Sequence, residues 1–334
     1  MDENREEPLC QASAVGDINV VRSLIAAGAD ATYFDGEGLT PLMHAAKAGN
    51  ADVAKYLLDC GAPWNALSPN GLSAGDFAME NGHQSVYNIL LNAGIQAELI
   101  LNSIARKDEG NGTSNMSYLE DRVAFSEDKV MDTERKAVMM AWEGPLMEAH
   151  AKAVCSVGGG DVLNIGFGMG LVDTAIQQYS PKSHTIVEAH PEVYDRMVRD
   201  GWDKKHNVKI VFGRWQDVIS QLESYDGIFF DTYGEYYEDM RDFHGHLPKL
   251  LKRGGGGVYS FFNGLCGSNP FFHVVYCEVV GLELEKLGFS TAFIPLPVKD
   301  CLGEKVWEGV KHRYWELDTY FLPVCQHRDD DDDA

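Results

Sequence analysis

The chain has 334 residues, 45% hydrophobic and 24% charged, which is enough for two folded domains that each bury a core. No apolar run approaches the ~20 residues of a membrane-spanning helix, and the acidic first residues are unlike a secretory signal, so we expect a cytoplasmic or nuclear protein without a membrane partner. A formal net charge of −23 opposes nucleic-acid phosphates, so we expect no direct nucleic-acid binding, and a basic protein is the better candidate partner. An acidic surface that only keeps the protein soluble is the alternative.

The seven cysteines are an odd number, widely scattered, with no Cys-x-x-Cys pair and no histidine cluster at zinc spacing. This pattern predicts reduced thiols in the core and no metal site. The run of aspartates near the C-terminus, within residues 329–334, predicts a solvated acidic tail.

The N-terminal third repeats with a period of 33 residues. Helix-sized segments with apolar spacing lie between the repeated glycines, each ending at a glycine suited to a left-handed cap. The segment 40–46 is similar to the Thr-Pro-Leu-His-x-Ala signature of ankyrin repeats, and 73–78 is a degraded copy of it. We therefore expect about three ankyrin repeats within residues 1–97. The repeated markers are Gly16-Asp17, Gly49-Asn50 and Gly82-His83, together with Gly28, Gly61 and Gly94.

The repeats predict a docking surface for another protein, because solenoids commonly offer such surfaces. A structural cap on the neighbouring domain is the alternative. After the repeats, a polar stretch rich in turn-forming residues predicts a linker over residues 98–115.

From Asp161 the chain alternates short β-prone runs with longer amphipathic segments. This order is typical of an α/β domain in which helices cover both faces of a parallel sheet, and we expect it within residues 116–328. Ligands of such sheets bind beyond the carboxyl ends of the strands. The expected strands are Val162–Ile165, Thr185–Val187, Val208–Phe212, Gly227–Phe230 and Gly257–Phe262.

The first two strand ends indicate a ligand that contains a ribose. The first strand runs into the glycine-rich segment 166–170, where the backbone can approach a ligand at a helix N-terminus. Leu171 occupies the third glycine place of a dinucleotide fingerprint, which disfavours NAD. The second strand ends in Glu188, whose carboxylate can accept hydrogen bonds from both ribose hydroxyls. A glycine turn made for packing and a solvated glutamate are the structural alternatives.

The third and fourth strand ends carry two further candidates. Trp215 follows the third strand and is either an aromatic wall for an adenine edge or a core residue. Asp231 follows a fully apolar run, which places it at the ligand-binding edge, although an isolated aspartate there could also cap a helix.

These motifs, with the upstream segment 138–147, resemble the guanidino N-methyltransferases over about residues 118–287. Two branches are candidates: guanidinoacetate methyltransferase, and the protein arginine methyltransferase that modifies the internal δ-nitrogen (type IV, or N5). The chain is closer to the protein-arginine branch, which its ankyrin-like extension also resembles. The matching blocks are 166–170, 188–191, 213–217, 241–248 and 261–265.

The resemblance implies a class I, Rossmann-like domain that uses S-adenosylmethionine to methylate an arginine in a protein, by family resemblance a ribosomal protein. Glu188 would bind the ribose, and Phe125 would close over the cofactor. Gln216 stands where guanidinoacetate enzymes carry glutamate. The residues implied to line the cofactor site are Phe125, Met139, Met147, Gly166, Phe167, Gly168, Met169, Gly170, Leu171, Glu188, Ala189, His190, Trp215, Gln216 and Asp231.

Glu143 and Asp231 match the family's carboxylates that hold the guanidino group. A guanidinium has a pKa near ~13, so proton loss should accompany or follow attack on the methyl group. Two carboxylates would bind the terminal nitrogens and leave the inner nitrogen facing the methyl, and either could take the proton. A small guanidino substrate fits the same geometry. An ankyrin adaptor that keeps only the methyltransferase fold is the third hypothesis, against which the intact carboxylates argue.

Overall fold

The computed structural model describes residues 5–108, 116–156, 158 and 160–328. The predicted tail and the end of the predicted linker, 109–115, lie outside them. The chain divides into two compact units, Met1–Glu109 with Cys266–Val279 and Gly110–Leu265 with Val280–Ala334. No helix of the described ranges is both long and apolar enough to cross a membrane.

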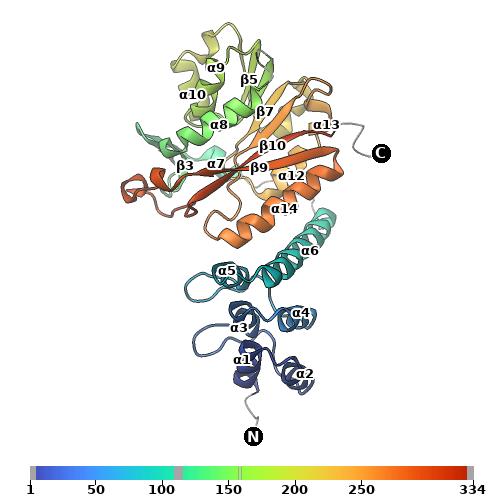
Figure 1. The fold of residues 1–334 in the computed structure, drawn as a ribbon. Helices are drawn as coiled ribbons and strands as arrows, with labels where there is room; N and C mark the ends of the chain where they lie inside the picture. The colour runs from blue at the N-terminus through green and yellow to red at the C-terminus, as the bar shows by residue number, and fades with distance from the viewer. Residues whose placement is uncertain (1–4, 109–115, 157, 159, 329–334) are drawn as a thin grey trace. The chain divides into compact units, whose positions relative to one another are not determined.

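The first unit contains the repeats, seen as successive helix pairs in Figure 1. The pairs are α1 (Glu6–Val15) with α2 (Ile18–Ala26), α3 (Pro41–Ala48) with α4 (Ala51–Asp59), and α5 (Ala74–Glu80) with α6 (Gln84–Asp108). Three successive helix pairs agree with the three predicted repeats.

Local capping explains where these helices begin and end. Thr40 Oγ1 accepts a hydrogen bond from Met43 N at 3.2 Å and so caps α3. In the degraded third copy Ser73 and Asp76 exchange hydrogen bonds in a capping box at the start of α5. Gly49 ends α3 in the left-handed conformation. Gly28 and Gly61, which follow α2 and α4, also have positive φ, as expected of left-handed caps.

Gly94 is not a helix cap, because α6 continues through it to Asp108. A Cβ at this position would lie 3.0 Å from the Trp64 ring and 3.1 Å from Val275. The glycine therefore allows close packing, and the first part of the predicted linker is helical.

The segment Cys266–Val279 belongs to the repeat unit although it is distant in sequence. Phe271, at the start of α14 (Pro270–Lys286), is fully buried in the same core as Leu42 and Leu90. Asp76 accepts hydrogen bonds from Asn269 Nδ2 at 2.7 Å and from Phe271 N at 3.2 Å. The helix thus starts in one unit, and its residues from Val280 belong to the other.

The second unit confirms the expected α/β class. Seven described strands form one sheet in the order β6-β5-β4-β7-β8-β10-β9, in which β4 to β8 are parallel and β9 and β10 are antiparallel. The strands are β4 (Asp161–Ile165), β5 (Ser183–Glu188), β6 (Val208–Phe212), β7 (Gly227–Phe230), β8 (Val258–Phe261), β9 (Phe289–Pro297) and β10 (Thr319–His327).

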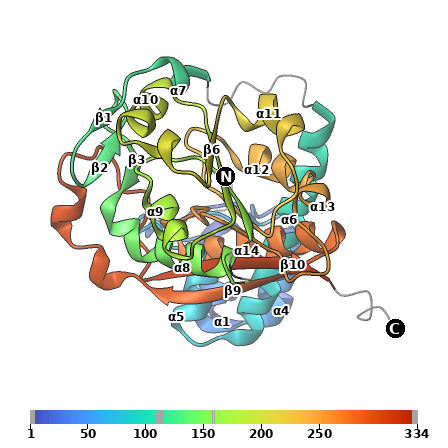
Figure 2. The same cartoon turned by 90° about the horizontal axis from the view of Figure 1, so that it is seen from above.

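Helices cover both faces of this sheet, as Figure 2 shows. Alternate residues of β4 point to opposite sides: Leu163 and Ile165 join the core that holds α11 to α14, whereas Val162 joins the core of α8 and α9. The helices are α8 (Gly144–Val154), α9 (Leu171–Gln178), α10 (Pro191–Arg199), α11 (Trp215–Val218), α12 (Tyr237–His244) and α13 (Leu247–Leu250).

A smaller sheet precedes the large one in sequence. Its strands β1 (Ala124–Phe125), β2 (Lys129–Met131) and β3 (Ala137–Met140) pair antiparallel after the short helix α7 (Met116–Glu120). A short 3₁₀ turn, Ala141–Glu143, joins β3 to α8. All seven cysteines are free. Four of them are buried as predicted, whereas Cys60 is exposed and Cys266 and Cys301 are only partly buried.

Candidate active site

A pocket lies at the carboxyl ends of β4, β5 and β7, the edge at which the sequence predicts ligand binding. Its empty space is about 580 Å³, a size typical of small-molecule sites. Seven predicted cofactor-site residues line it: Met139, Gly166, Gly168, Glu188, Ala189, Trp215 and Asp231.

In the glycine-rich turn after β4, steric crowding requires glycine at position 166. Its φ is +94°, and an added Cβ would lie 1.8 Å from the backbone oxygen of Asp231. Only glycine fits this approach. The turn therefore brings the end of β4 against the end of β7 and sets the floor of the pocket.

Glu188 is buried and held by the same turn. Its Oε2 accepts a hydrogen bond from Phe167 N at 2.9 Å, and its Oε1 accepts one from His190 N at 2.6 Å. Burial raises the pKa of Glu188, and the backbone N–H groups oppose that rise by stabilising the charged form. The carboxylate is thus fixed in the pocket wall, where each oxygen can accept a further hydrogen bond.

Trp215 is both a core residue and part of the pocket wall. Its ring packs against Phe243 with centroids 5.4 Å apart. Its Nε1 donates to Glu235, as do Gln216 Nε2 at 2.7 Å and Thr232 Oγ1 at 2.7 Å. One carboxylate, which the sequence did not single out, therefore orders three side chains on this side of the pocket.

Two tyrosines, Tyr118 and Tyr233, also line the pocket. Tyr118 of α7 lies between His190 and Tyr233, with ring centroids 4.8 and 4.7 Å away. Tyr233 donates to Asp132 Oδ2 at 3.0 Å. His190 does not line the pocket; it caps α10 through Glu192 N and holds Asp121 O through Nε2. These contacts tie the residues before β1 to the ends of β5 and β7.

Glu143 and Asp231 lie close enough for their charges to interact. Glu143 is buried; its Oε1 accepts hydrogen bonds from Met140 N at 3.0 Å and from the Tyr314 hydroxyl. Burial and the charge of Asp231 raise the pKa of Glu143, and burial raises the pKa of Asp231. Two carboxylates that resist ionisation together are suited to receive a cation.

A second pocket adjoins the first and shares Asp231, Thr232 and Glu235 with it. Tyr236, Tyr237 and Phe262 contribute aromatic walls, and Gly264 and Leu265 complete the far side. Asp231 therefore stands at the junction of two spaces, one of them bordered by Glu188.

Several predicted residues lie outside the first pocket's lining. Phe125 packs with Arg196, whose guanidinium carbon lies 4.7 Å from the ring centroid, and Met147 is fully buried in a core. Conversely, Tyr118, Tyr233 and Glu235 line the pocket without having been predicted. The predicted residues outside the lining are Phe125, Met147, Phe167, Met169, Gly170, Leu171, His190, Gln216 and, of the carboxylate pair, Glu143.

Comparison with known proteins gives two family matches. Residues 111–271 match the guanidinoacetate N-methyltransferase family, and residues 9–100 match the ankyrin repeats. The two matches follow one another along the chain as the sequence predicts.

Curated relatives from fungi carry the name protein arginine N-methyltransferase 2. The relative from Yarrowia lipolytica is 38% identical over 237 residues, covering 67% of this chain and 50% of the relative. The one from Cryptococcus neoformans is 33% identical over 255 residues, 67% of this chain and 70% of the relative. The Saccharomyces cerevisiae protein is 34% identical over 231 residues, which cover 66% of this chain and 55% of the relative.

The chain spans about half the length of the first of these relatives and 70% of the Cryptococcus relative. Sequence similarity, the ankyrin repeats and the mostly parallel sheet agree with one another. The chain belongs to the protein arginine N-methyltransferase 2 family.

Proposed function

We propose that this protein transfers a methyl group from S-adenosylmethionine to the internal δ-nitrogen of an arginine in a protein substrate. The observation that carries the proposal is the pair Glu143 and Asp231, two interacting carboxylates of which Asp231 stands at the junction of two pockets. The family name supports methylation of a protein arginine. The choice of nitrogen rests on the carboxylate pair.

The first pocket suits the cofactor in its chemistry. Glu188 offers carboxylate oxygens for ribose hydroxyls, and Gly166 and Gly168 leave room for a ligand near the backbone. S-adenosylmethionine, when bound, supplies an electrophilic methyl group on sulfur.

The carboxylates would act on the substrate. Paired with the two terminal nitrogens, they hold the guanidinium and concentrate its positive charge there. The inner nitrogen, which has no carboxylate partner, keeps its lone pair available for the new N–C bond. As that bond forms, the bond between the methyl group and the sulfur would break and leave a neutral thioether, and the nitrogen would lose its proton to Asp231 or Glu143. A carboxylate with a raised pKa is the better acceptor near neutral pH.

The second pocket would receive the arginine side chain. Its aromatic walls, Tyr236, Tyr237 and Phe262, suit the aliphatic stem and the flat guanidinium. Because this pocket shares only Asp231, Thr232 and Glu235 with the first, an arginine side chain in it would reach Asp231 while the cofactor occupies the first pocket. A protein chain could thus be modified without entering the first pocket.

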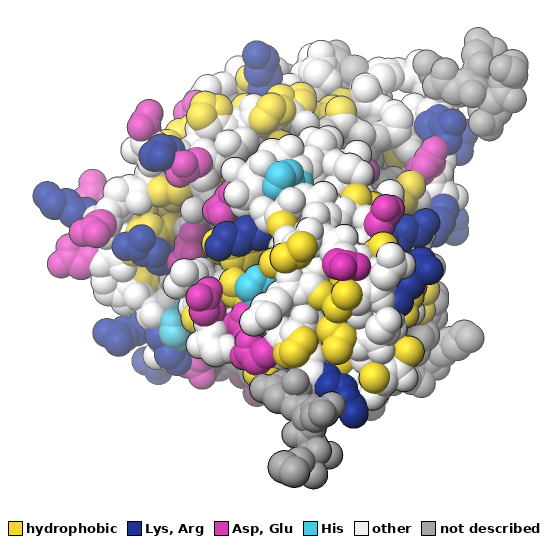
Figure 3. All heavy atoms as spheres, turned by 60° about the horizontal axis from the view of Figure 1, so that its bottom comes forward, with side chains coloured by type: hydrophobic (Ala, Val, Ile, Leu, Met, Phe, Trp, Pro, Cys, Tyr) yellow, Lys and Arg dark blue, Asp and Glu magenta, His cyan; other side chains and the backbone are white. Residues whose placement is uncertain are grey.

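We further propose that the repeats dock a basic substrate protein, for which a ribosomal protein is a candidate. Phe34 and Leu67 occupy the same place in successive repeat loops, 33 residues apart, and are 46% and 45% exposed. In Figure 3 apolar side chains lie between charged ones of both signs. Exposed apolar residues at regular loop positions are suited to contacts with another protein.

A label-transfer experiment separates a protein substrate from a small one. The full chain is incubated with methyl-labelled S-adenosylmethionine and either an extract of macromolecules or guanidinoacetate, the substrate named by the matching family model. We expect the label in protein, where digestion recovers it on arginine, and no label in guanidinoacetate. Label confined to guanidinoacetate would replace the proposal with the small-molecule activity, and no label with either would favour an inactive adaptor.

A further inference from the structure

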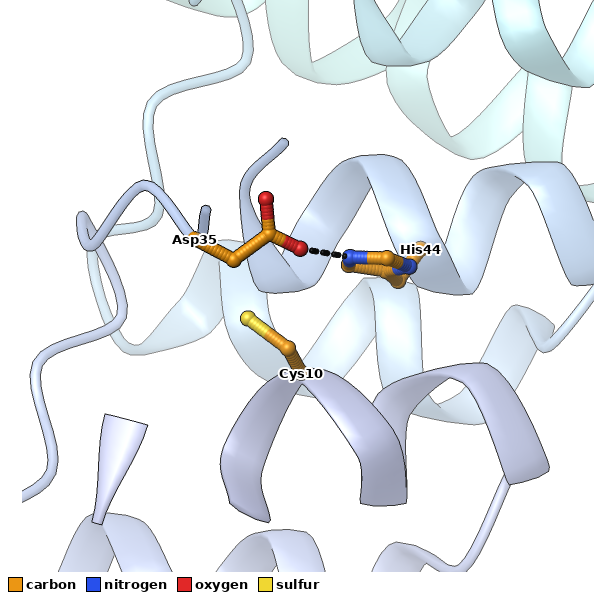
Figure 4. A group of neighbouring side chains, drawn as sticks. All are labelled: Cys10, Asp35 and His44. Carbon is orange, nitrogen blue, oxygen red and sulfur yellow. Dashed lines mark hydrogen bonds and ion pairs between the residues drawn. The ribbon is translucent and has the colours of Figure 1, made fainter. Parts of the chain in front are cut away.

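Three side chains with metal-binding atoms converge in the first two repeats, far from the pocket in sequence. Figure 4 shows the Cys10 thiol, the Asp35 carboxylate and the His44 imidazole pointing toward one another. Their ligand atoms all lie within 4.8 Å of one another. His44 Nε2 is 2.6 Å from Asp35 Oδ2. Cys10 is 3% exposed, and the side chains of Asp35 and His44 are 9% and 20% exposed.

The repeat fold does not demand these residue types. One repeat later, 33 residues along, the same three places hold Met43, Ser68 and Phe77. Ser68 Oγ accepts a hydrogen bond from Leu72 N at 3.1 Å. Asp35 Oδ1 accepts the equivalent hydrogen bond from Leu39 N at 2.9 Å. A hydroxyl group is therefore sufficient to hold this turn. The second oxygen of Asp35, the thiol and the imidazole are therefore additional to what the repeat needs.

We propose that Cys10, Asp35 and His44 bind a divalent transition metal ion of the zinc type. Thiolate sulfur, imidazole nitrogen and carboxylate oxygen are zinc ligands, and three protein ligands leave a fourth position of the tetrahedron open. Metal–ligand distances of about 2.0 to 2.3 Å place the ligand atoms roughly 3 to 4 Å apart. Atoms at the 4.8 Å limit would therefore need to approach by roughly 1 to 2 Å, whereas His44 Nε2 and Asp35 Oδ2, now 2.6 Å apart, would need to separate slightly.

The fourth position would go to water or to Glu7. Glu7 lies on the same helix as Cys10, and its charge, like that of Asp35, raises the pKa of the Cys10 thiol. Binding the ion displaces the thiol proton into solvent and forms the metal–sulfur bond, with no change of oxidation state. The ion would then neutralise the acidic groups around Cys10 and join α1 to the loop and helix of the next repeat.

A simple side-chain pair is the competing interpretation. His44 and Asp35 form a hydrogen bond or ion pair by themselves, and Cys10 could be only a core thiol. A reactive thiol is disfavoured, because burial and the nearby acidic residues raise the pKa of Cys10 to about 12. The pair interpretation predicts no metal binding, which makes the two readily separable.

Cobalt(II) titration of the reduced full-length protein tests the site. Cobalt(II) in a tetrahedral site with a thiolate gives visible d–d bands and a near-ultraviolet sulfur-to-cobalt charge-transfer band. We expect both at one equivalent of cobalt, their loss on adding zinc, and a thermal unfolding midpoint several degrees higher with excess zinc.

Two variants use residues that the next repeat already accommodates at the same places. Cys10→Met and His44→Phe should fold, and both should lose the charge-transfer band and the stabilisation by zinc. Cys60→Ser, which removes the exposed thiol of the neighbouring repeat, should keep both. Absence of the band in the unsubstituted protein, or a band that persists in Cys10→Met, would overturn the proposal.

Discussion

At the level of single residues, the proposed mechanism rests on Glu143 and Asp231. Glu143→Gln keeps an oxygen that can accept the hydrogen bonds from Met140 N and the Tyr314 hydroxyl. The local fold should therefore be retained. Each amide substitution removes one negative charge from the guanidinium site. We expect kcat to fall on the order of 100-fold or more for either variant.

Calorimetry and steady-state kinetics measure this effect. S-adenosylmethionine affinity of Glu143→Gln should be nearly unchanged, because Glu143 does not line the cofactor pocket. Glu148→Gln and Asp217→Asn, on exposed carboxylates of α8 and α11, are the matched controls and should retain full turnover. Normal kcat in both active-site variants would remove the pair from the mechanism.

The same pair predicts a pH dependence. The folded pKa values, about 8 for Glu143 and about 7 for Asp231, lie above the ordinary carboxyl range near ~4. The guanidinium needs the charged pair, so kcat/KM should rise with pH through 7 to 8. Because the folded protein holds these protons more tightly than the unfolded chain, the pair's contribution to stability falls as pH rises between about 4 and 8.

The pH profile of kcat/KM tests the predicted rise in activity. Urea unfolding at several pH values tests the predicted fall in stability. In the double variant Glu143→Gln with Asp231→Asn, the free energy of unfolding should depend less on pH, because the contribution of the pair is removed. A variant with the unsubstituted protein's slope would show that the pair does not carry the shifted protons.

Three of the residues that the sequence singled out lie at or shortly after the end of a strand. Glu188, Trp215 and Asp231 were placed by the strands before them, and all three line the pocket. Glu235 lies in the loop between β7 and α12, and Tyr118 lies in the short helix α7. No periodic pattern in the sequence points to either residue. Tyr314 contacts Glu143 from 171 residues away, a pairing that only the folded chain brings about.

At the level of elements, α14 is part of the repeat unit's core. Phe271 is fully buried, and its ring fills the space above Gly75, where an added Cβ would lie 2.2 Å away. Phe271→Ala should therefore destabilise this unit by about 3 to 5 kcal/mol. Phe34→Ala, on an exposed phenylalanine of the same unit, should change stability by less than about 0.5 kcal/mol.

Denaturant unfolding monitored by circular dichroism would measure both variants. Similar small losses would show that the start of α14 is dispensable to the repeats. The packing also means that deleting the repeats would expose Phe271 and Val275, so surface substitutions are the cleaner test of docking.

Elements were predictable where their pattern is strong. The parallel strands β4 to β8 are short apolar runs, and their predicted bounds agree with the structure within two residues. The antiparallel strands β9 and β10 contain Pro295, Pro297 and Pro323, and proline argues against a strand. Gly94 suggested a helix end because its period matched the caps, but the glycine serves packing against Trp64.

At the level of the whole molecule, docking and chemistry should be separable. Replacing Phe34 and Leu67 together by serine removes two exposed apolar side chains from the repeat loops. We expect a several-fold higher KM for the protein substrate, with kcat and cofactor affinity unchanged. Val15→Ser, at a position 81% exposed at the end of α1, is the control. An unchanged KM in the double variant would favour a purely structural role of the repeats.

The position of the methyl group on arginine tests the central claim most directly. Tandem mass spectrometry of the labelled substrate distinguishes the nitrogens, because a terminal methyl leaves with methylamine, whereas a δ-methyl stays on fragments that keep the inner nitrogen. A fork formed by Glu143 and Asp231 occupies both terminal nitrogens, so we predict label only on the δ-nitrogen. Label lost as methylamine would place the methyl on a terminal nitrogen and contradict the proposed geometry.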